Sequence, residues 1–177
     1  MPALLLPVQG IMPTIGPDCF LADNATVVGD VVLGRGCTVW FTAVIRGDVN
    51  SIRIGDETNI QDGAVLHCTY QKAALTIGSR VSIGHRALVH GCTVEDDVLI
   101  GMGAIVMDHA LVGRGCLIAA GAVVLENMVC EPGYLYAGVP AKKIKPVSEA
   151  QAEGLRRTAA NYQLYASWFT DGATAVV

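Results

Sequence analysis

Aliphatic residues recur at every sixth position along most of the chain, and this period restricts the possible folds more than any other feature of the sequence. From residue 15 to residue 124 the step of six is broken only three times, by two longer intervals and one shorter one. The inward positions predicted by this grid are Ile15, Leu21, Val27, Leu33, Val39, Ile45, Ile54, Ile60, Leu66, Ile77, Ile83, Val89, Val94, Ile100, Val106, Val112, Ile118 and Val124.

A six-residue period is typical of a solenoid in which each repeat forms one short face and three faces close one coil. Eighteen faces correspond to about six coils around a core of stacked aliphatic columns. A β-sandwich would instead need strands separated by turns at irregular intervals of about 8–12 residues. The repeat resembles that of left-handed parallel β-helices, and the resemblance supplies the handedness, since parallel crossovers are usually right-handed.

Two further positions of the six-residue repeat also favour particular residue types. The residue four places after each aliphatic position is usually small or β-branched. Glycine often follows the aliphatic residue directly, and we interpret this as a sharp corner between short strands. These glycines are Gly34, Gly55, Gly78, Gly84, Gly101 and Gly113.

We expect a single domain spanning residues 1–177, an all-β solenoid with a C-terminal α-helix packed alongside. Its parts are a β-helix over about 12–130, a loop over 131–147, a helix over 148–169 and a tail over 170–177.

The helix prediction depends on a start signal and an apolar face. Ser148 followed by Gln151 has the spacing of a capping box. Beyond it, Leu155, Ala159 and Ala166 share one face with Tyr162, and we expect that face to pack along the outside of the solenoid.

Composition restricts the partners and the location. The 177 residues are 52% hydrophobic and 16% charged, which suits one domain with a sizeable core. A net charge of −4 argues against nucleic acid or an anionic membrane as partner, although lysines occur at 142, 143 and 145. The apolar run at residues 4–6 stops at Pro7 and has no basic flank, so neither a signal peptide nor a membrane span is predicted. A cytoplasmic location is the default expectation.

Six cysteines could indicate a metal site or disulfides, but no C-x-x-C pair occurs among them. Cys19, Cys37 and Cys116 occupy the small interior position of the repeat. We therefore expect reduced core cysteines that pack as small apolar residues.

Two histidines share one column of the grid. His67 follows Leu66 and His90 follows Val89, so both take the same outward position in adjacent coils. Neighbouring strands are about 4.8 Å apart, and imidazoles at that separation can bind one metal ion. The alternative is that they are ordinary surface histidines.

His85 lies two places after Ile83 and therefore near a different edge of the prism. It is not expected to reach the same ion as His67 and His90 within one chain. A homotrimer would solve this, because a head-to-tail interface brings two different edges together. Three histidines with an open fourth position are typical of catalytic zinc. His109 fits no such column and is interpreted as a surface residue or a cavity wall.

The chain resembles the gamma-class carbonic anhydrases over essentially its whole length. The matching runs are residues 44–48, 59–67, 83–92 and 138–142, and the specific part is the histidine set with its last two members five apart. The resemblance implies a homotrimer with His67, His85 and His90 as metal ligands at subunit interfaces. It implies Zn²⁺ as cofactor, with Fe²⁺, Co²⁺ or Ni²⁺ as alternatives. The implied reaction is reversible hydration of CO₂ to bicarbonate by a metal-bound hydroxide.

Further residues fall on family positions that surround the metal. Arg46 could pair with Asp48, or with Asp62 across an interface, and provide positive charge near bicarbonate. Gln61 could orient a metal-bound water. Tyr162 on the helix could also approach the site, as a helical residue does in relatives.

One segment departs from the family pattern. The best-studied active members carry an acidic loop after the first histidine, and the glutamate of that loop carries protons. Residues 68–74 contain no carboxylate here, which puts fast turnover in doubt. Two other functions therefore stay open. One is a hexapeptide-repeat acyltransferase with His109 or His85 as base, and the other is a trimeric binding or scaffold protein whose metal only holds the trimer together.

Overall fold

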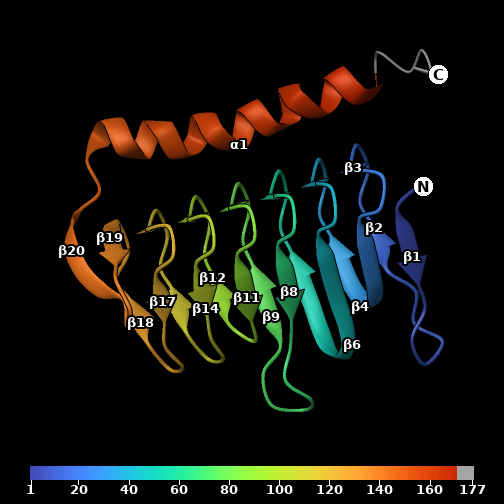
Figure 1. The fold of residues 1–177 in the computed structure, drawn as a ribbon, viewed down its shortest axis with the longest axis horizontal. Helices are drawn as coiled ribbons and strands as arrows, with labels where there is room; N and C mark the ends of the chain where they lie inside the picture. The colour runs from blue at the N-terminus through green and yellow to red at the C-terminus, as the bar shows by residue number, and fades with distance from the viewer. Residues whose placement is uncertain (171–177) are drawn as a thin grey trace.

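The six-residue period builds a parallel β-solenoid of about seven turns, with helix α1 (Glu149–Thr170) along one side (Figure 1). This computed structural model describes residues 1–170. It confirms the predicted class, a left-handed β-helix with one C-terminal helix. The predicted tail, apart from Thr170, lies outside the described residues.

The strands form two hydrogen-bonded sheets that make the three faces of a prism. The 12-stranded sheet forms two faces, because two long strands continue across the edge between them. Its strands are β1 (Leu4–Leu6), β2 (Thr14–Ile15), β4 (Thr26–Leu33), β6 (Val44–Ile54), β8 (Val65–His67), β9 (Leu75–Ile77), β11 (Leu88–His90), β12 (Thr93–Val94), β14 (Ile105–Val106), β15 (Leu111–Val112), β17 (Val123–Val124) and β18 (Val129–Cys130). The 8-stranded sheet contains β3 (Phe20–Leu21), β5 (Thr38–Val39), β7 (Asn59–Ile60), β10 (Ser82–Ile83), β13 (Leu99–Ile100), β16 (Leu117–Ile118), β19 (Tyr134–Ala137) and β20 (Lys142–Pro146).

We name the faces by what they carry. The helix face is the 8-stranded sheet, against which α1 packs. The histidine face consists of β1, the first parts of β4 and β6, and then β8, β11, β14 and β17. The third face consists of β2, the last parts of β4 and β6, and then β9, β12, β15 and β18.

The strand register aligns the aliphatic grid into interior columns. Ile83, for example, pairs with Ile60 below it and Ile100 above it, and all three side chains are fully buried. The columns extend beyond the predicted range at the C-terminal end, where Cys130 pairs with Val112 and Tyr136 pairs with Ile118.

The N-terminal end is extended in the same way by Leu5, which pairs with Val27. The sequence therefore predicted about one coil too few. The inward residues at the two ends of the solenoid are either not aliphatic or not six residues away from the next inward residue.

The predicted glycines begin the short connections between strands, but they do not adopt the left-handed conformation for which a glycine would be needed at a sharp corner. Gly55 lacks a left-handed φ, and a Cβ added to it would lie 2.7 Å from the carbonyl carbon of Gly78 in the next turn. The residues with positive φ lie two places after these glycines, and they are of many types. The corner residues are Asp18, Asn24, Gly36, Thr42, Glu57, Gly63, Arg80, Arg86, Asp97, Gly103, His109, Gly115, Gly121, Asn127 and Gly133. Glycine after the inward residue is thus required by close contact between turns.

Replacing Gly55 with alanine should lower the free energy of unfolding by about 1–3 kcal/mol or more, because the new methyl group meets the backbone of the next turn. The control is Gly115→Asn at a corner with a φ of 67°, where an added Cβ has its nearest neighbour at 4.0 Å. Asparagine tolerates that conformation, so this variant should stay near wild type. Urea unfolding of both proteins tests the difference, and equal losses would contradict the assignment of the two glycine classes.

The segment predicted as a loop over 131–147 contains two strands instead. β19 continues the helix face, and β20 pairs with it antiparallel. Tyr136 fills the last interior position, and its hydroxyl accepts a hydrogen bond from the Glu131 backbone N–H at 2.8 Å. All of β20 is exposed, and its lysines at an edge strand discourage further strand addition.

Helix α1 begins at the predicted capping box. The Ser148 N–H donates to Gln151 Oε1 at 3.0 Å, and the Gln151 N–H donates to Ser148 Oγ at 3.3 Å. Leu155, Ala159 and Ala166 are buried against the solenoid, which confirms the predicted apolar face. The helix runs back from the last turns toward the first ones (Figure 1).

An aromatic cluster joins the end of α1 to the first turns. Trp40 contacts the rings of Phe20, Tyr162 and Phe169, with centroid separations of 5.2 to 5.7 Å.

Within residues 1–170, no helix combines the length and the apolar character needed to cross a membrane.

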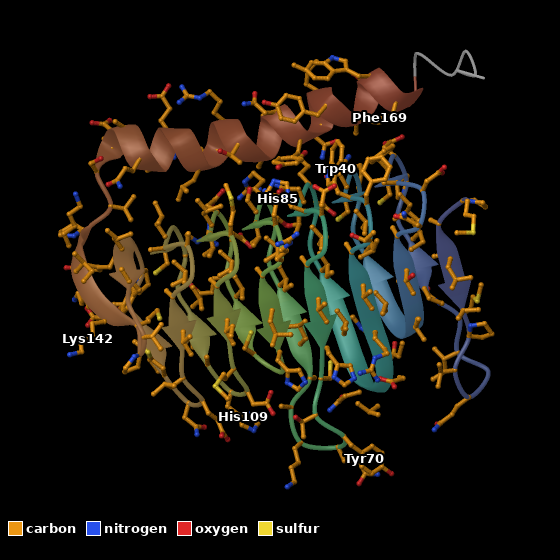
Figure 2. The ribbon with its side chains drawn as sticks, viewed as in Figure 1. Trp40, Tyr70, His85, His109, Lys142 and Phe169 are labelled. Carbon is orange, nitrogen blue, oxygen red and sulfur yellow. The ribbon has the colours of Figure 1, made fainter. Side chains whose placement is uncertain are left out.

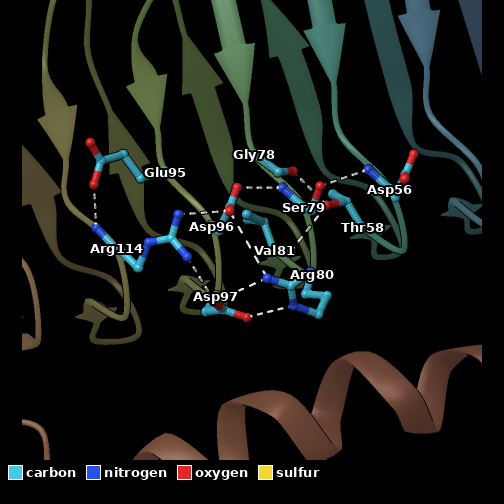
Figure 3. A network of polar contacts seen from close by, with 10 residues as sticks. All are labelled: Asp56, Thr58, Gly78, Ser79, Arg80, Val81, Glu95, Asp96, Asp97 and Arg114. Atoms are coloured by element: carbon cyan, nitrogen blue, oxygen red, sulfur yellow. Dashed lines mark hydrogen bonds and ion pairs between the residues drawn. The ribbon is translucent and has the colours of Figure 1, made fainter.

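Polar side chains connect successive turns at the edge between the third face and the helix face (Figure 3). Ser79 Oγ accepts from the Asp56 N–H at 3.0 Å, and the Ser79 N–H donates to Asp96 Oδ1 at 2.9 Å. Asp96 also pairs with Arg114 at 3.0 Å. These side chains satisfy backbone N–H groups at corners where the strand hydrogen bonds stop.

Asp96→Ala should lower the free energy of unfolding by about 1–3 kcal/mol, because the Ser79 N–H loses its acceptor. Asp96→Asn keeps an oxygen in that position and removes only partly exposed ion pairs, so it should stay within about 1 kcal/mol of wild type. Chemical denaturation of both variants separates the two contributions. Equal destabilisation would mean that charge pairing, and not the backbone acceptor, stabilises this edge.

Candidate metal centre

His67 and His90 stack on the histidine face in adjacent turns. β8 and β11 pair in parallel, and the register sets the two histidines opposite each other, as the grid predicts. Nδ1 of His67 lies 3.0 Å from Nε2 of His90, and the ring centroids are 5.1 Å apart. Both side chains are partly buried.

A carboxylate contacts the second nitrogen of each ring. Asp48 Oδ1 lies 2.9 Å from His67 Nε2, and Asp108 Oδ1 lies 2.5 Å from His90 Nδ1. Arg46 Nη1 pairs with Asp48 Oδ2 at 2.5 Å, which is the intrachain alternative predicted for this arginine. Thr69 donates its hydroxyl proton to Asp108. Both histidines are therefore fixed from behind by ionisable groups of the same chain.

Both carboxylates are stabilised in the charged form. Partial burial opposes ionisation of Asp48, but hydrogen bonds from His67 and Arg46 outweigh it and lower the pKa of Asp48 below its ordinary value. Partial burial likewise opposes ionisation of Asp108, and hydrogen bonds from Thr69 and His90 lower its pKa. A negative charge thus faces each imidazole on the side away from the other ring.

The pair fits a metal ion on geometric grounds. Two nitrogens that each lie about 2.0–2.1 Å from one zinc ion are at most about 4.2 Å apart. The facing nitrogens of His67 and His90 are 3.0 Å apart, inside that limit. A carboxylate on the other nitrogen of a metal-binding histidine is the usual arrangement that orients the ring. The geometry of the two residues is therefore compatible with two ligands of one metal ion.

His85 lies at a different edge, beneath α1 (Figure 2). Its Nδ1 pairs with Asp62 Oδ2 at 2.9 Å, and its backbone N–H donates to Gln61 Oε1 at 3.2 Å. Gln61 is buried and donates through Nε2 to Asn59 Oδ1 at 3.0 Å. The predicted water-orienting glutamine is thus fixed as a support of the His85 backbone.

His85 and Gln61 line a pocket of about 350 Å³ together with Tyr162. Burial, followed by the charge of Asp62, raises the pKa of Tyr162 to about 12. The phenol therefore remains protonated near neutral pH and can act there as a hydrogen-bond donor.

The single chain does not bring the three predicted ligands together. Across the described residues 1–170, no cluster of three or more His, Cys, Asp or Glu side chains has the arrangement to hold a metal ion. His67 and His90 form one part, with Asp48 and Asp108 behind them, and His85 forms another.

Asp108 was not identified from the sequence, although the grid contains a signal for it. Asp108 stands two places after Val106, in the position that Gly91 takes after Val89 one turn below. A Cβ on Gly91 would lie 2.4 Å from Asp108 Oδ1, so the glycine leaves room for the carboxylate beside His90. His109 is an exposed corner residue with a φ of 58°.

Beside the histidine column, the histidine face is apolar from β6 to β17. Its outward positions one residue before the inward grid hold Val44, Val65, Leu88, Ile105 and Val123. Val65, Met107 and Leu125 are 37%, 40% and 45% exposed. Helix α1 packs on another face, so the chain leaves an apolar strip beside His67 and His90.

The comparisons with known proteins agree with this architecture. The family described as bacterial transferase hexapeptide (six repeats) matches residues 12–47 and 91–126, and the hexapeptide repeat of succinyl-transferase matches residues 74–107. A Bacillus cereus protein provisionally named an acetyltransferase has a solved structure that superposes with a TM-score of 0.93. It is 34% identical, over 97% of this chain and 99% of its own.

Similar proteins of known name identify the family within the hexapeptide-repeat proteins. Protein YrdA of Escherichia coli is 41% identical over 97% of this chain and 96% of its own length. Carbonic anhydrase of Geobacillus kaustophilus is 37% identical over 90% of this chain and 87% of its own. Gamma carbonic anhydrase 2 of Arabidopsis thaliana is 38% identical over 88% of this chain, which spans 59% of that protein. The chain belongs to the gamma-class carbonic anhydrase family of hexapeptide-repeat proteins.

Proposed function

We propose that the protein is a homotrimeric carbonic anhydrase that holds one Zn²⁺ at each subunit interface, between His67 and His90 of one subunit and His85 of its neighbour. The reaction is reversible hydration of CO₂ to bicarbonate. The observation that carries the proposal is the stacked histidine pair, whose facing nitrogens are 3.0 Å apart and whose other nitrogens contact carboxylates.

The apolar strip of the histidine face supports the trimer. A closed three-fold ring needs two different surfaces of the chain in contact. The strip is one, and the edge that carries His85 is the other. Burying aliphatic side chains contributes about 25 cal/mol per Å² of apolar surface removed from water. The same contact would bring His85 of one subunit to the half-site of the next.

When bound, zinc in such a site is a Lewis acid that makes a water molecule nucleophilic near neutral pH. The surrounding residues bind and orient. Asp48 and Asp108 fix the tautomer of their histidines, and the Arg46 guanidinium beside Asp48 places positive charge where bicarbonate forms. Met107 stands directly above His90 in the same column and provides an apolar wall for CO₂.

Proton removal is the step in which this chain differs from its best-studied relatives. The connection between β8 and β9 has no carboxylate, and Thr69 of that connection is bound to Asp108. Tyr70 at its tip is 62% exposed (Figure 2). We therefore expect turnover to be limited by proton transfer and to rise with the concentration of an external buffer such as imidazole.

The test is stopped-flow CO₂ hydration on anaerobically purified protein whose metal content is determined in the same sample. Hydration that disappears on chelation and returns with zinc supports the proposal. One metal per chain in a stable trimer without hydration would instead support a metal that only holds the subunits together.

Acyl transfer is the second candidate, since the structural relative from Bacillus cereus is provisionally named an acetyltransferase. Titration calorimetry with acetyl-CoA separates the two activities. Saturable binding of acetyl-CoA together with absent hydration would favour the transferase.

A further inference from the structure

Cys19 and Cys37 occupy the same interior position in adjacent turns. Each stands four places after an inward residue, and the strands that follow them, β3 and β5, pair in parallel from Phe20 onward. The Phe20 N–H donates to the Cys37 carbonyl at 2.9 Å. Neighbouring strands are about 4.8 Å apart, within the Cα separation of about 4.4–6.8 Å found in disulfides.

The two thiols point in the same direction. Cys19 Sγ lies 3.1 Å from the carbonyl oxygen of Gly34, and Cys37 Sγ lies 3.1 Å from that of Gly55. Those carbonyls belong to successive turns of the third face. The sulfur atoms therefore take equivalent positions in successive turns at one corner of the prism.

The two cysteines differ in exposure. Cys37 is fully buried, whereas Cys19 is partly exposed and lines a pocket of about 300 Å³ between this corner and α1. Asp18 and Gln163 line the same pocket. A small solute can reach Cys19 there while Cys37 stays behind it. This edge is distinct from the apolar strip proposed to join subunits.

The environment of the pair favours attack by Cys19. The neighbouring Cys37 thiol, whose effect outweighs that of partial burial, lowers the pKa of Cys19 below its ordinary value. The interaction with Cys19, followed by burial, raises the pKa of Cys37. The thiolate is the reactive form of cysteine, so Cys19 is the more reactive thiol of the two.

The other four cysteines serve as internal comparisons. Burial raises the pKa of Cys68 to about 11 and that of Cys130 to about 12. Burial also raises the pKa values of Cys92 and Cys116. All four are buried and are expected to be inert.

We propose that Cys19 and Cys37 form a peroxide-reactive dithiol that closes to an intramolecular disulfide. The Cys19 thiolate attacks one oxygen of hydrogen peroxide, the O–O bond breaks, and the departing oxygen takes up a proton to leave as water. Cys37 then attacks the sulfenic sulfur of Cys19. The S–S bond forms, the S–O bond breaks, and the leaving hydroxide takes the Cys37 proton as water. Two thiols and one peroxide thus give one disulfide and two waters.

The test is peptide mapping of the full-length wild-type protein, which is treated with a small excess of hydrogen peroxide, freed of the peroxide, and then denatured and alkylated. The expected result is a peptide pair linked through Cys19 and Cys37, with the other four cysteines alkylated and the link removed by dithiothreitol. In Cys37→Ser, Cys19 should stop at the sulfenic acid and react with dimedone. In Cys19→Ser, Cys37 should remain alkylatable.

Two results on the wild-type protein would overturn the proposal without any variant. One is a Cys19 that stays fully alkylatable after peroxide. The other is oxidation spread evenly over the six cysteines. Neither result bears on the metal site, because no metal ligand is a cysteine in the proposed function.

Discussion

His90→Ala is expected to remove bound metal and CO₂ hydration together while leaving the solenoid folded. His90 supplies one of the two facing nitrogens and is also the partner of Asp108. Loss of groups behind a metal ligand typically costs about 10–100-fold in affinity or activity, so loss of a ligand should cost at least about 100-fold. Metal analysis per chain and stopped-flow hydration measure the two effects, and circular dichroism checks the fold.

The matched control is His109→Asn. His109 is an exposed corner residue with a positive φ, a conformation that asparagine tolerates and already adopts at Asn24 and Asn127. This variant should keep its metal and its activity. Stoichiometric metal in the His90 variant would show that the ligands are assigned wrongly.

Leu88→Asp is expected to convert the trimer to monomers and to release the metal. Leu88 projects from the middle of the apolar strip, beside Val65 and Ile105 in the neighbouring turns. Burying an unpaired carboxylate at an interface costs several kcal/mol, and a trimer would contain it three times. Light scattering should then give a mass near that of the 18.5 kDa chain.

Thr76→Asp provides the control for that variant. Thr76 projects from β9 on the third face and is exposed. The added charge is the same, but it faces water, so the trimer and the metal should be retained. Dissociation of both variants would point to a general effect of charge, whereas a trimeric Leu88 variant would mean that the strip is not the interface.

The interior of the fold was predictable because each turn repeats one requirement. A residue such as Ile83 has an equivalent residue above and below it, so one period assigns every inward position and stacks His67 on His90. The spacing does not reveal how turns contact each other. The role of Gly55 depends on such a contact, because the backbone of Gly78 in the next turn lies where a Cβ would stand.

The remaining parts of the site depend on side-chain conformations and on a second chain. The contact between Asp108 and His90 depends on the side-chain rotamer of Asp108. The six-residue period contains no information about rotamers. The support of His85 by Gln61 similarly depends on the buried amide of Asn59. The end turns escaped prediction because Tyr136 replaces an aliphatic residue where the solenoid closes.

Metal content of mixed trimers tests the central claim, a site shared between subunits, most directly. His85→Ala and His90→Ala chains are each expected to bind no metal alone. In a mixed trimer, one interface pairs the intact His67 and His90 of the first variant with the intact His85 of the second. Random assembly of equal amounts should therefore restore about a quarter of the wild-type zinc. Mixed trimers that bind no zinc would contradict the shared site.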